Sequence, residues 1–277
     1  MKFGANTFIW SDRFGAEQYP LLEKIKRAGF DGIEVPLFDP DQYRGSIARR
    51  SIEQHGLECT VCAVLPTGLH TASADAVIRR RAEEHLRASV EATAELGSRL
   101  IAGPLYSPVG YFSGSRRTDD EWKRAVETFQ QVGPALDKHD VTLAIEPLNR
   151  YETYFLNTAA DTVRFCREIG HPRIGILFDT YHANIEEKDV AAAIREAAPY
   201  LRHFHSCEND RGIPGTGHVD WPAVFAALHE AKYNHWLTIE SFGFSLGALS
   251  AAASIWRDLA PSAEDIAVKG LRFLKTF

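Results

Sequence analysis

The sequence predicts an α/β protein that folds as a single (β/α)8 TIM barrel, with one domain spanning residues 1–277. Eight short apolar runs bounded by turn residues alternate with eight stretches in which apolar residues recur every three to four positions. The length of 277 residues is also near the ~250 residues typical of this fold. The alternative is an open doubly wound sheet, which needs a glycine-rich phosphate turn after an early strand. Neither GxGxxG nor a P-loop pattern occurs.

The apolar runs are typical of strands that are buried on both faces, as in parallel sheets. The expected strands are 2–9, 32–37, 57–65, 99–104, 141–148, 174–181, 201–206 and 235–242. The expected helices are 16–29, 41–56, 75–97, 118–140, 158–170, 190–200, 220–233 and a region after Gly247. Thr118 with Glu121 fits a capping box, and Asp220 precedes a first turn that contains Pro222. Other helices should end at a glycine, as at Gly29.

Charge and hydropathy restrict the classes of partner. The net charge is −6, which argues against a nucleic-acid or anionic-membrane partner. No apolar run approaches the ~20 residues that a membrane-spanning helix needs. The N-terminal MKFGANTFIW lacks the basic and apolar segments of a secretory signal. We therefore expect a cytoplasmic protein.

The four cysteines are expected to be unbridged thiols. Cys59 and Cys62 form a CxxC motif, but an odd separation on a strand points the two side chains to opposite faces. This argues against a redox-active motif or a zinc site. Cys166 falls in a helix and Cys207 follows a strand, so no disulfide framework is indicated. Cys62 is also a candidate for the wall of a pocket.

Four consecutive predicted strands end in a residue of a metal-ligand type. These residues are Glu146, Asp179, His205 and Glu240. Catalytic groups of this fold lie at the C-terminal ends of strands, where neighbouring strands can direct their last side chains to one spot. Three carboxylates and one imidazole form an oxygen-rich donor set that suits Mn²⁺, Mg²⁺ or Co²⁺ better than a structural zinc. The excess of carboxylate charge leaves one or two of these groups able to act as bases.

Each of these residues has a structural alternative. A single carboxylate at a strand end is more often a helix cap or an ion-pair partner, and it is their recurrence on consecutive strands that favours a site. His203 shares a strand face with His205, and spacing alone does not choose between them, although His205 lies nearer the open end. Glu34, in GIEVP, is equally well a structural hydrogen-bonding group or part of the site.

Four segments carry a resemblance to a known family. IEPLNRYET, LFDTYHANIEE, HFHSCENDRGIPGTGHVDW and IESF resemble those of the ketose 3-epimerases, which include D-tagatose, D-allulose (D-psicose) and L-ribulose 3-epimerases among the xylose-isomerase-like barrels. The resemblance covers essentially the whole chain. It implies an isomerase with one divalent metal, usually manganese, and an assembly of two or four identical chains. The residues that match the family's metal ligands are Glu146, Asp179, His205 and Glu240.

The implied chemistry is the epimerisation of a free 2-ketose at C3, in pairs such as D-tagatose and D-sorbose, D-fructose and D-allulose, or ribulose and xylulose. This reaction removes the proton next to the carbonyl group and returns one to the opposite face. A metal acting as a Lewis acid stabilises the enediolate. Glu146 and Glu240 are expected to flank the sugar, one removing the proton and the other supplying it.

The resemblance also implies substrate contacts. Glu152, His182 and Arg211 are expected near the O1 and O2 end of a small-molecule sugar. An apolar wall against the distal carbons is expected from residues that end or follow strands. They are Phe8, Trp10, Cys62, Tyr106 and Phe242.

Three other functions fit parts of the pattern. A hydroxypyruvate isomerase or an inosose dehydratase would keep the metal and both glutamates but change different atoms. A DNA-repair enzyme like the endonuclease IV group would need further ligands for several zinc ions and a basic face, and the net charge of −6 argues against it. A sugar-binding protein without catalysis would have little need for two opposed carboxylates.

Overall fold

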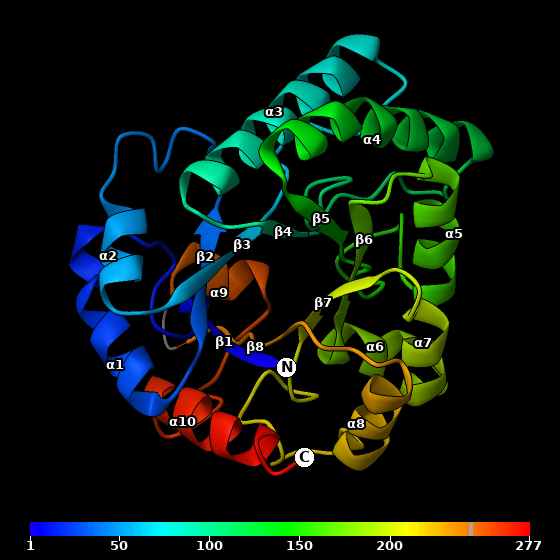
Figure 1. Ribbon diagram of the computed structural model, residues 1–277. Coiled ribbons are helices and arrows are strands. Elements are labelled where there is room, and N and C mark those ends of the chain that lie inside the picture. The colour runs from blue at the N-terminus through cyan, green and yellow to red at the C-terminus, as the bar shows by residue number, and fades with distance from the viewer. Residues whose placement is uncertain (244–245) are drawn as a thin grey trace.

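A closed barrel of eight parallel strands forms the centre of the molecule (Figure 1). The computed structural model describes residues 1–243 and 246–277. The strands follow one another in chain order, and the last pairs with the first through Lys2–Trp236 and Ala5–Ile239. The predicted fold class is therefore confirmed. The strands are β1 (Lys2–Asn6), β2 (Gly32–Leu37), β3 (Glu58–Ala63), β4 (Leu100–Gly103), β5 (Thr142–Ile145), β6 (Ile174–Asp179), β7 (Leu201–His205) and β8 (Trp236–Ile239).

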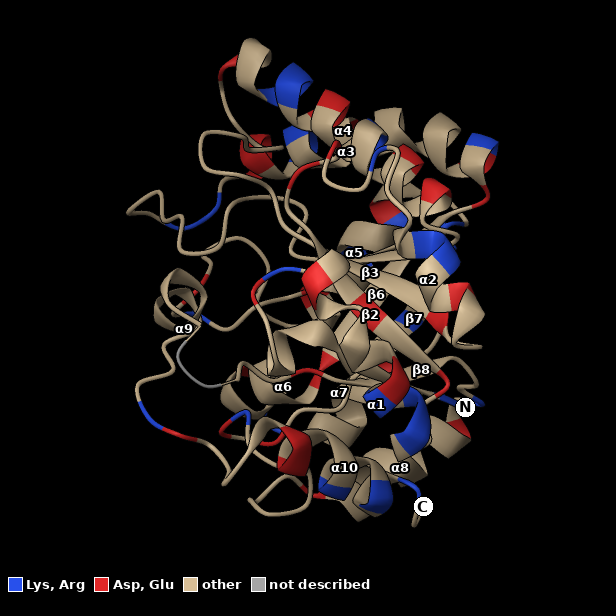
Figure 2. Ribbon diagram, turned by 90° about the vertical axis from the view of Figure 1, so that its left-hand side faces the viewer, with Lys and Arg blue, Asp and Glu red and all other residues tan. Residues whose placement is uncertain are grey.

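Most helices surround the barrel and cover the outer faces of the strands (Figure 1), whereas the short helix Ala248–Ala252 lies at one end of the molecule (Figure 2). The described residues form ten α-helices. They are α1 (Pro20–Ala28), α2 (Ala48–Gln54), α3 (Ala76–Glu95), α4 (Asp119–His139), α5 (Ala159–Ile169), α6 (Thr180–Glu186), α7 (Val190–Ala197), α8 (Trp221–Glu230), α9 (Ala248–Ala252) and α10 (Ala263–Leu274), with two short 3-10 turns, η1 (Thr7–Ile9) and η2 (Ala16–Gln18). Among the described helices, none is both long enough and apolar enough to cross a membrane.

The capping patterns predicted from the sequence are present. The Oγ1 atom of Thr118 accepts a hydrogen bond from the backbone N–H of Glu121, and the Glu121 carboxylate accepts one from the backbone N–H of Thr118. Asp220 accepts from the backbone N–H of Ala223 at the start of α8. Gly29 ends α1 with a φ of 97°, in the left-handed region that glycine adopts without strain.

The region between β2 and β3 is less helical than the sequence predicts. A helix over 41–56 was expected, but α2 begins only at Ala48. Gly45 has a φ of 64°, which interrupts a right-handed helix, and Asp39 accepts from the backbone N–H of Asp41 to hold a tight turn. Phe38, the first residue after β2, lines a cavity at the barrel mouth.

One end of the barrel is filled by side chains. Leu100, Ala102, Ala144 and Leu177 form a buried cluster against Trp236. Ala144, Leu177 and Trp236 stand at even separations from Glu146, Asp179 and Glu240, respectively, along the same strands, so both groups face the barrel interior. Both chain termini lie at the end of the molecule opposite α9 (Figure 2). The other end of the barrel, where the strands have their C-terminal ends, is where active sites of this fold lie.

Candidate metal centre and active site

Four buried side chains converge where β5 to β8 end. They are Glu146, Asp179, His205 and Glu240, and one ligand atom from each lies within 4.8 Å of the others. The register of the sheet brings them together, because Asp179 pairs directly with His205 across β6 and β7. A register shift in β6 between Ile176 and Leu177 precedes this pairing. All four residues predicted as ligands from their strand positions therefore meet at one point.

The chemistry of this cluster fits a divalent cation. Oε1 of Glu146 and Nδ1 of His205 are buried and have no hydrogen-bond partner among the described residues. Nδ1 of His205 lies 3.4 Å from Oε2 of Glu240 and 3.7 Å from Oδ2 of Asp179. A buried imidazole nitrogen and three carboxylates directed at one point form a donor set that hard divalent cations accept.

Arg211 compensates part of this negative charge. Its Nη1 atom lies 2.7 Å from Oδ2 of Asp179 and 2.7 Å from Oε2 of Glu240. The residue adopts a left-handed φ of 64°, and its guanidinium carbon lies 4.2 Å from the centre of the Tyr181 ring. Burial by itself would raise the pKa of Asp179, but the Arg211 guanidinium holds it well below its usual range.

Glu146 has the opposite protonation preference. Burial, together with the neighbouring Glu240 carboxylate, raises the pKa of Glu146 well above its ordinary value. A carboxyl group whose pKa is raised holds an accepted proton more readily than an ordinary carboxyl group, which suits a general base. The surroundings of the two neighbouring carboxylates, Glu146 and Asp179, thus shift their pKa values in opposite directions.

Asn149 positions two residues that the sequence assigned to the substrate. Its backbone N–H donates to Nδ1 of His182, and its side-chain amide donates to Oε1 of Glu152 at 2.8 Å. Burial lowers the pKa of His182 to about 3, so the ring is a neutral hydrogen-bonding group. Its Nε2 atom lies 3.6 Å from Oε1 of Glu146. Sequence reasoning missed Asn149, although it stands in the same PLNRYET segment as Glu152.

A cavity of about 160 Å³ opens beside these groups. Glu146, Glu152, His182, Arg211 and Glu240 line its polar side. Its apolar side includes Phe8, Phe38, Cys62, Val64, Phe242 and Leu249. The Phe8 ring stacks between two others, with centroids 5.5 Å from Phe242 and 5.9 Å from Phe38.

Two of the residues expected in the apolar wall lie elsewhere. Tyr106 is only 1% exposed and packs in the core, with its ring centroid 5.3 Å from that of Phe155. Trp10 packs against the main hydrophobic core. Neither is among the described side chains that line the cavity. A strand end marks which end of the barrel a residue occupies, but not whether its side chain turns inward or outward.

Cys62 lies on the cavity wall with its Sγ 3.9 Å from Oε1 of Glu240. Burial raises the pKa of the Cys62 thiol well above its ordinary value, so the thiol is protonated. All four cysteines are free, as the sequence predicted.

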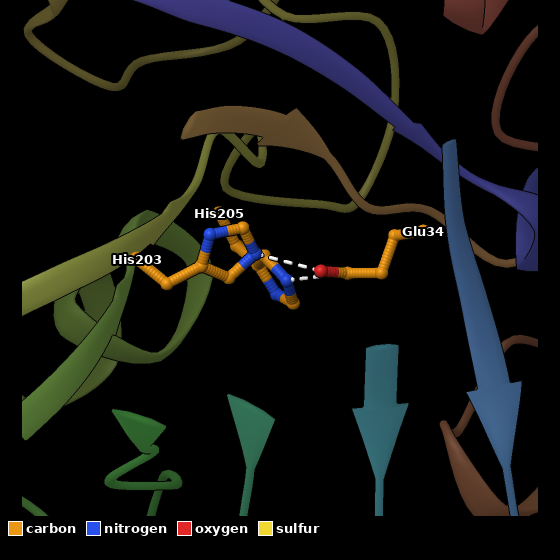
Figure 3. Close-up of side chains that lie close together, drawn as sticks. All are labelled: Glu34, His203 and His205. Carbon is orange, nitrogen blue, oxygen red and sulfur yellow. Dashed lines mark hydrogen bonds and ion pairs between the residues drawn. The ribbon is translucent and has the colours of Figure 1, made fainter. Parts of the chain in front are cut away.

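Glu34 and His203 lie next to the four-residue cluster rather than in it. Figure 3 shows Glu34 together with His203 and His205. Nε2 of His203 is 2.7 Å from Oε2 of Glu34, and Nε2 of His205 is 2.8 Å from Oε1 of Glu34. The structure therefore distinguishes the two histidines that spacing left open. It also gives Glu34 a hydrogen-bonding role against His205.

Glu208 organises the loop that carries Arg211, and sequence reasoning missed it. The fully buried carboxylate accepts hydrogen bonds from the backbone N–H groups of Gly215 and Val219 and from Nε1 of Trp221. The available signal was a carboxylate among glycines in CENDRGIPGTG.

Comparison with known proteins places the chain in a family. A family model described as xylose isomerase-like TIM barrel matches residues 22–277. A probable ketose 3-epimerase of Synechocystis sp. is 39% identical over 276 residues, which cover 99% of this chain and 96% of the relative. A D-psicose 3-epimerase of Agrobacterium fabrum is 31% identical, with 95% of this chain and 93% of the relative covered.

The fold of a solved relative is nearly the same. The crystal structure of D-allulose 3-epimerase from Methylomonas sp. in complex with D-allulose superposes with a TM-score of 0.94 and 29% identity, covering 100% of this chain and 96% of the other. The chain therefore belongs to the ketose 3-epimerase family of xylose isomerase-like TIM barrels, and so to the carbohydrate epimerases, a class of isomerase.

Proposed function

We propose that this protein is a metal-dependent epimerase that inverts C3 of free 2-ketoses. The observation that carries the proposal is the placement of Glu146 and Glu240. Both carboxylates belong to the four-residue cluster and line the same cavity. They reach this cavity from the ends of β5 and β8, which are separated by two other strands. Inversion at one carbon by proton transfer needs a proton-transfer group on each face of that carbon, and two carboxylates carried by separated strands can supply them.

The residues that would hold the ion are Glu146, Asp179, His205 and Glu240. Mn²⁺ is the first choice because the donors are mostly carboxylates, and Mg²⁺ or Co²⁺ are alternatives. When bound, the ion would supply Lewis-acid polarisation of the ketose carbonyl group.

The proton transfers fall to the two glutamates. One carboxylate removes the C3 proton, and the other gives a proton to the opposite face of the same carbon. In the reverse reaction the two exchange roles. Glu146 is suited to hold the transferred proton, since its pKa is raised by burial and by Glu240, and since its Oε1 atom has no partner among the described residues.

The remaining cavity residues would bind and orient the sugar. His182, Arg211 and Glu152 offer hydrogen-bonding groups for the O1 and O2 end. The stacked Phe8 and Phe242 rings offer an apolar surface for the distal carbons. Among the described residues, the apolar side of the cavity carries no charged group that could bind a phosphate, which supports free sugars as substrates.

The test is product identification. The Mn²⁺-loaded protein would be incubated with D-fructose, D-tagatose and D-ribulose, and the products separated and identified by carbon NMR. We expect the C3 epimer of at least one ketose to accumulate to an equilibrium that is also reached from the product side. Formation of an aldose from one of these ketoses, or of a dehydrated product when an inosose is supplied instead, would replace the epimerase proposal by one of the related barrel activities.

We also propose a cytoplasmic homodimer or homotetramer. Its structural support is a group of exposed rings on the loops that follow β4 and β5. Tyr111, Phe112 and Tyr151 are 44%, 47% and 75% exposed, and a bridge between Tyr111 and Thr153 joins the two loops. Light scattering of the purified protein gives its mass in solution, and a mass of 30.9 kDa, that of one chain, would contradict this assembly.

A further inference from the structure

A fully buried carboxylate, Glu34, lies inside the barrel next to the four-residue cluster. The register places it in a row across three strands, between Asn6 of β1 and Thr60 of β3. His203 and His205 reach it from β7. In Figure 3 the two imidazole rings point at the same carboxylate. Polar side chains from four strands therefore meet at Glu34.

Four side chains among the described residues form hydrogen bonds with the Glu34 carboxylate. Oε1 accepts from Nδ2 of Asn6 at 3.0 Å and from Nε2 of His205 at 2.8 Å. Oε2 accepts from Oγ1 of Thr60 at 2.9 Å and from Nε2 of His203 at 2.7 Å. Each oxygen thus accepts two bonds, which fills the acceptor capacity of an ionised carboxylate.

The bond to His205 determines which of its nitrogens faces the cluster. A neutral imidazole has one N–H and one lone pair. With the N–H on Nε2 and donated to Glu34, the lone pair is on Nδ1, the atom that lies 3.4 Å from Oε2 of Glu240. Nδ1 of His205 has no hydrogen-bond partner among the described residues.

A second connection runs from Glu34 to Glu240 through Asn6. The Asn6 amide nitrogen that donates to Glu34 lies 3.3 Å from Oε1 of Glu240. The Oδ1 atom of the same amide accepts from the backbone N–H of Phe8, which fixes the orientation of the group. One oxygen of Glu240 is thereby occupied, and the other, Oε2, is directed toward His205 and Arg211.

We propose that Glu34 is the positioning residue of the metal centre, presenting Nδ1 of His205 to the ion and orienting Glu240 through Asn6. The inference rests on the proposed function only in taking the four-residue cluster as a metal site. Outer hydrogen bonds of this kind fix the tautomer and ring orientation of metal-binding histidines, and their loss typically costs about 10–100-fold in metal affinity.

The same atoms do not make a good second metal site. Glu34, His203 and His205 are close enough to share an ion. However, the amide of Asn6 and the hydroxyl of Thr60 both donate to this carboxylate, and N–H and O–H groups directed at the same oxygens would oppose a cation. The arrangement favours four hydrogen bonds over coordination.

The first test is made on the unsubstituted protein, and a variant serves only to assign its signals. Protein labelled with ¹⁵N in its histidine rings would be observed by NMR without metal and with diamagnetic Mg²⁺, and the signals assigned by comparison with His203→Gln. We expect His203 and His205 to carry a proton on Nε2 in both states. A His205 ring without a proton on Nε2 would overturn the proposal.

The second test is Glu34→Gln, which keeps the shape but replaces one acceptor oxygen with an N–H₂ donor. We expect the Kd for Mn²⁺, measured by titration calorimetry, to rise about 10–100-fold. Raising Mn²⁺ to saturation should restore most of the lost kcat. Glu34→Asp, which keeps the charge, should lose less affinity than Glu34→Gln.

Glu58→Gln is the matched control. It makes the same chemical change on β3 at an exposed carboxylate paired with Lys2, and it should leave the Kd unchanged. An unchanged Kd in folded Glu34→Gln would overturn the proposal, as would two bound ions per chain. If Glu34→Gln does not fold, the ring tautomers of the unsubstituted protein decide the question. The ring tautomers and the Kd for Mn²⁺ are measured without a sugar, so these two results are independent of whether the epimerase proposal holds.

Discussion

Glutamine in place of either Glu146 or Glu240 should lower kcat for C3 epimerisation by about 10²–10⁴-fold, the usual contribution of a positioned general base or acid. An amide keeps an oxygen for the metal but cannot accept the C3 proton. The two variants should also differ in which of the two epimers exchanges its C3 proton with solvent. Each should still exchange the C3 proton of one epimer with solvent, through the glutamate that remains, without forming the other epimer. Proton NMR of each pure epimer in D₂O measures this exchange.

Asp179→Asn separates loss of a base from loss of a ligand. Asp179 belongs to the same cluster but has no assigned proton transfer. Its variant should bind Mn²⁺ more weakly and recover activity as Mn²⁺ is raised, whereas Glu146→Gln and Glu240→Gln should stay slow at saturating Mn²⁺. Recovery of all three variants by excess metal would show that the glutamates act only as ligands.

Removal of the metal should abolish epimerisation and lower the thermal midpoint. Glu146, Asp179 and Glu240 form a buried group of carboxylates, with Arg211 in direct contact with two of them. An ion bound at 100 times its Kd adds about 2.7 kcal/mol to the stability of the folded state. Treatment with EDTA followed by gel filtration, with metal content measured by mass spectrometry, should give a protein that melts at a lower temperature. Mn²⁺ should restore both the midpoint and the activity.

The Asp179→Asn variant is again the control, because its midpoint should respond less to EDTA than that of the unsubstituted protein. Full activity in a sample shown to contain no metal would contradict the proposed mechanism.

The barrel and the cluster could be predicted because both follow from position along the chain. Buried strands alternate with amphipathic helices, and the parallel arrangement places every strand end at one face. It could therefore be predicted, without any information on side-chain conformation, that Glu146, Asp179, His205 and Glu240 meet. The local capping signals at Thr118 and Asp220 were reliable for the same reason, since partners three residues apart are fixed by the helix itself.

Contacts between distant strands could not be read in the same way. The link between Glu34 and His203 depends on which residues face inward at the same height in the barrel, across a separation of 169 positions. Asn6 and Glu208 are ordinary polar residues in the sequence, and only burial reveals their roles. Tyr106 was misplaced because an aromatic residue after a strand can turn to the cavity or, as here toward Phe155, to the core.

The most direct test of the central claim is the position of solvent deuterium in the first product formed. The Mn²⁺-loaded protein would be incubated with its best ketose in D₂O, and the reaction stopped at low conversion. If Glu146 and Glu240 act on opposite faces, the epimer should carry one deuterium at C3 from the first turnovers, and none at C1. An epimer that keeps its original C3 hydrogen, or deuterium at C1 with formation of an aldose, would contradict proton transfer between two opposed glutamates.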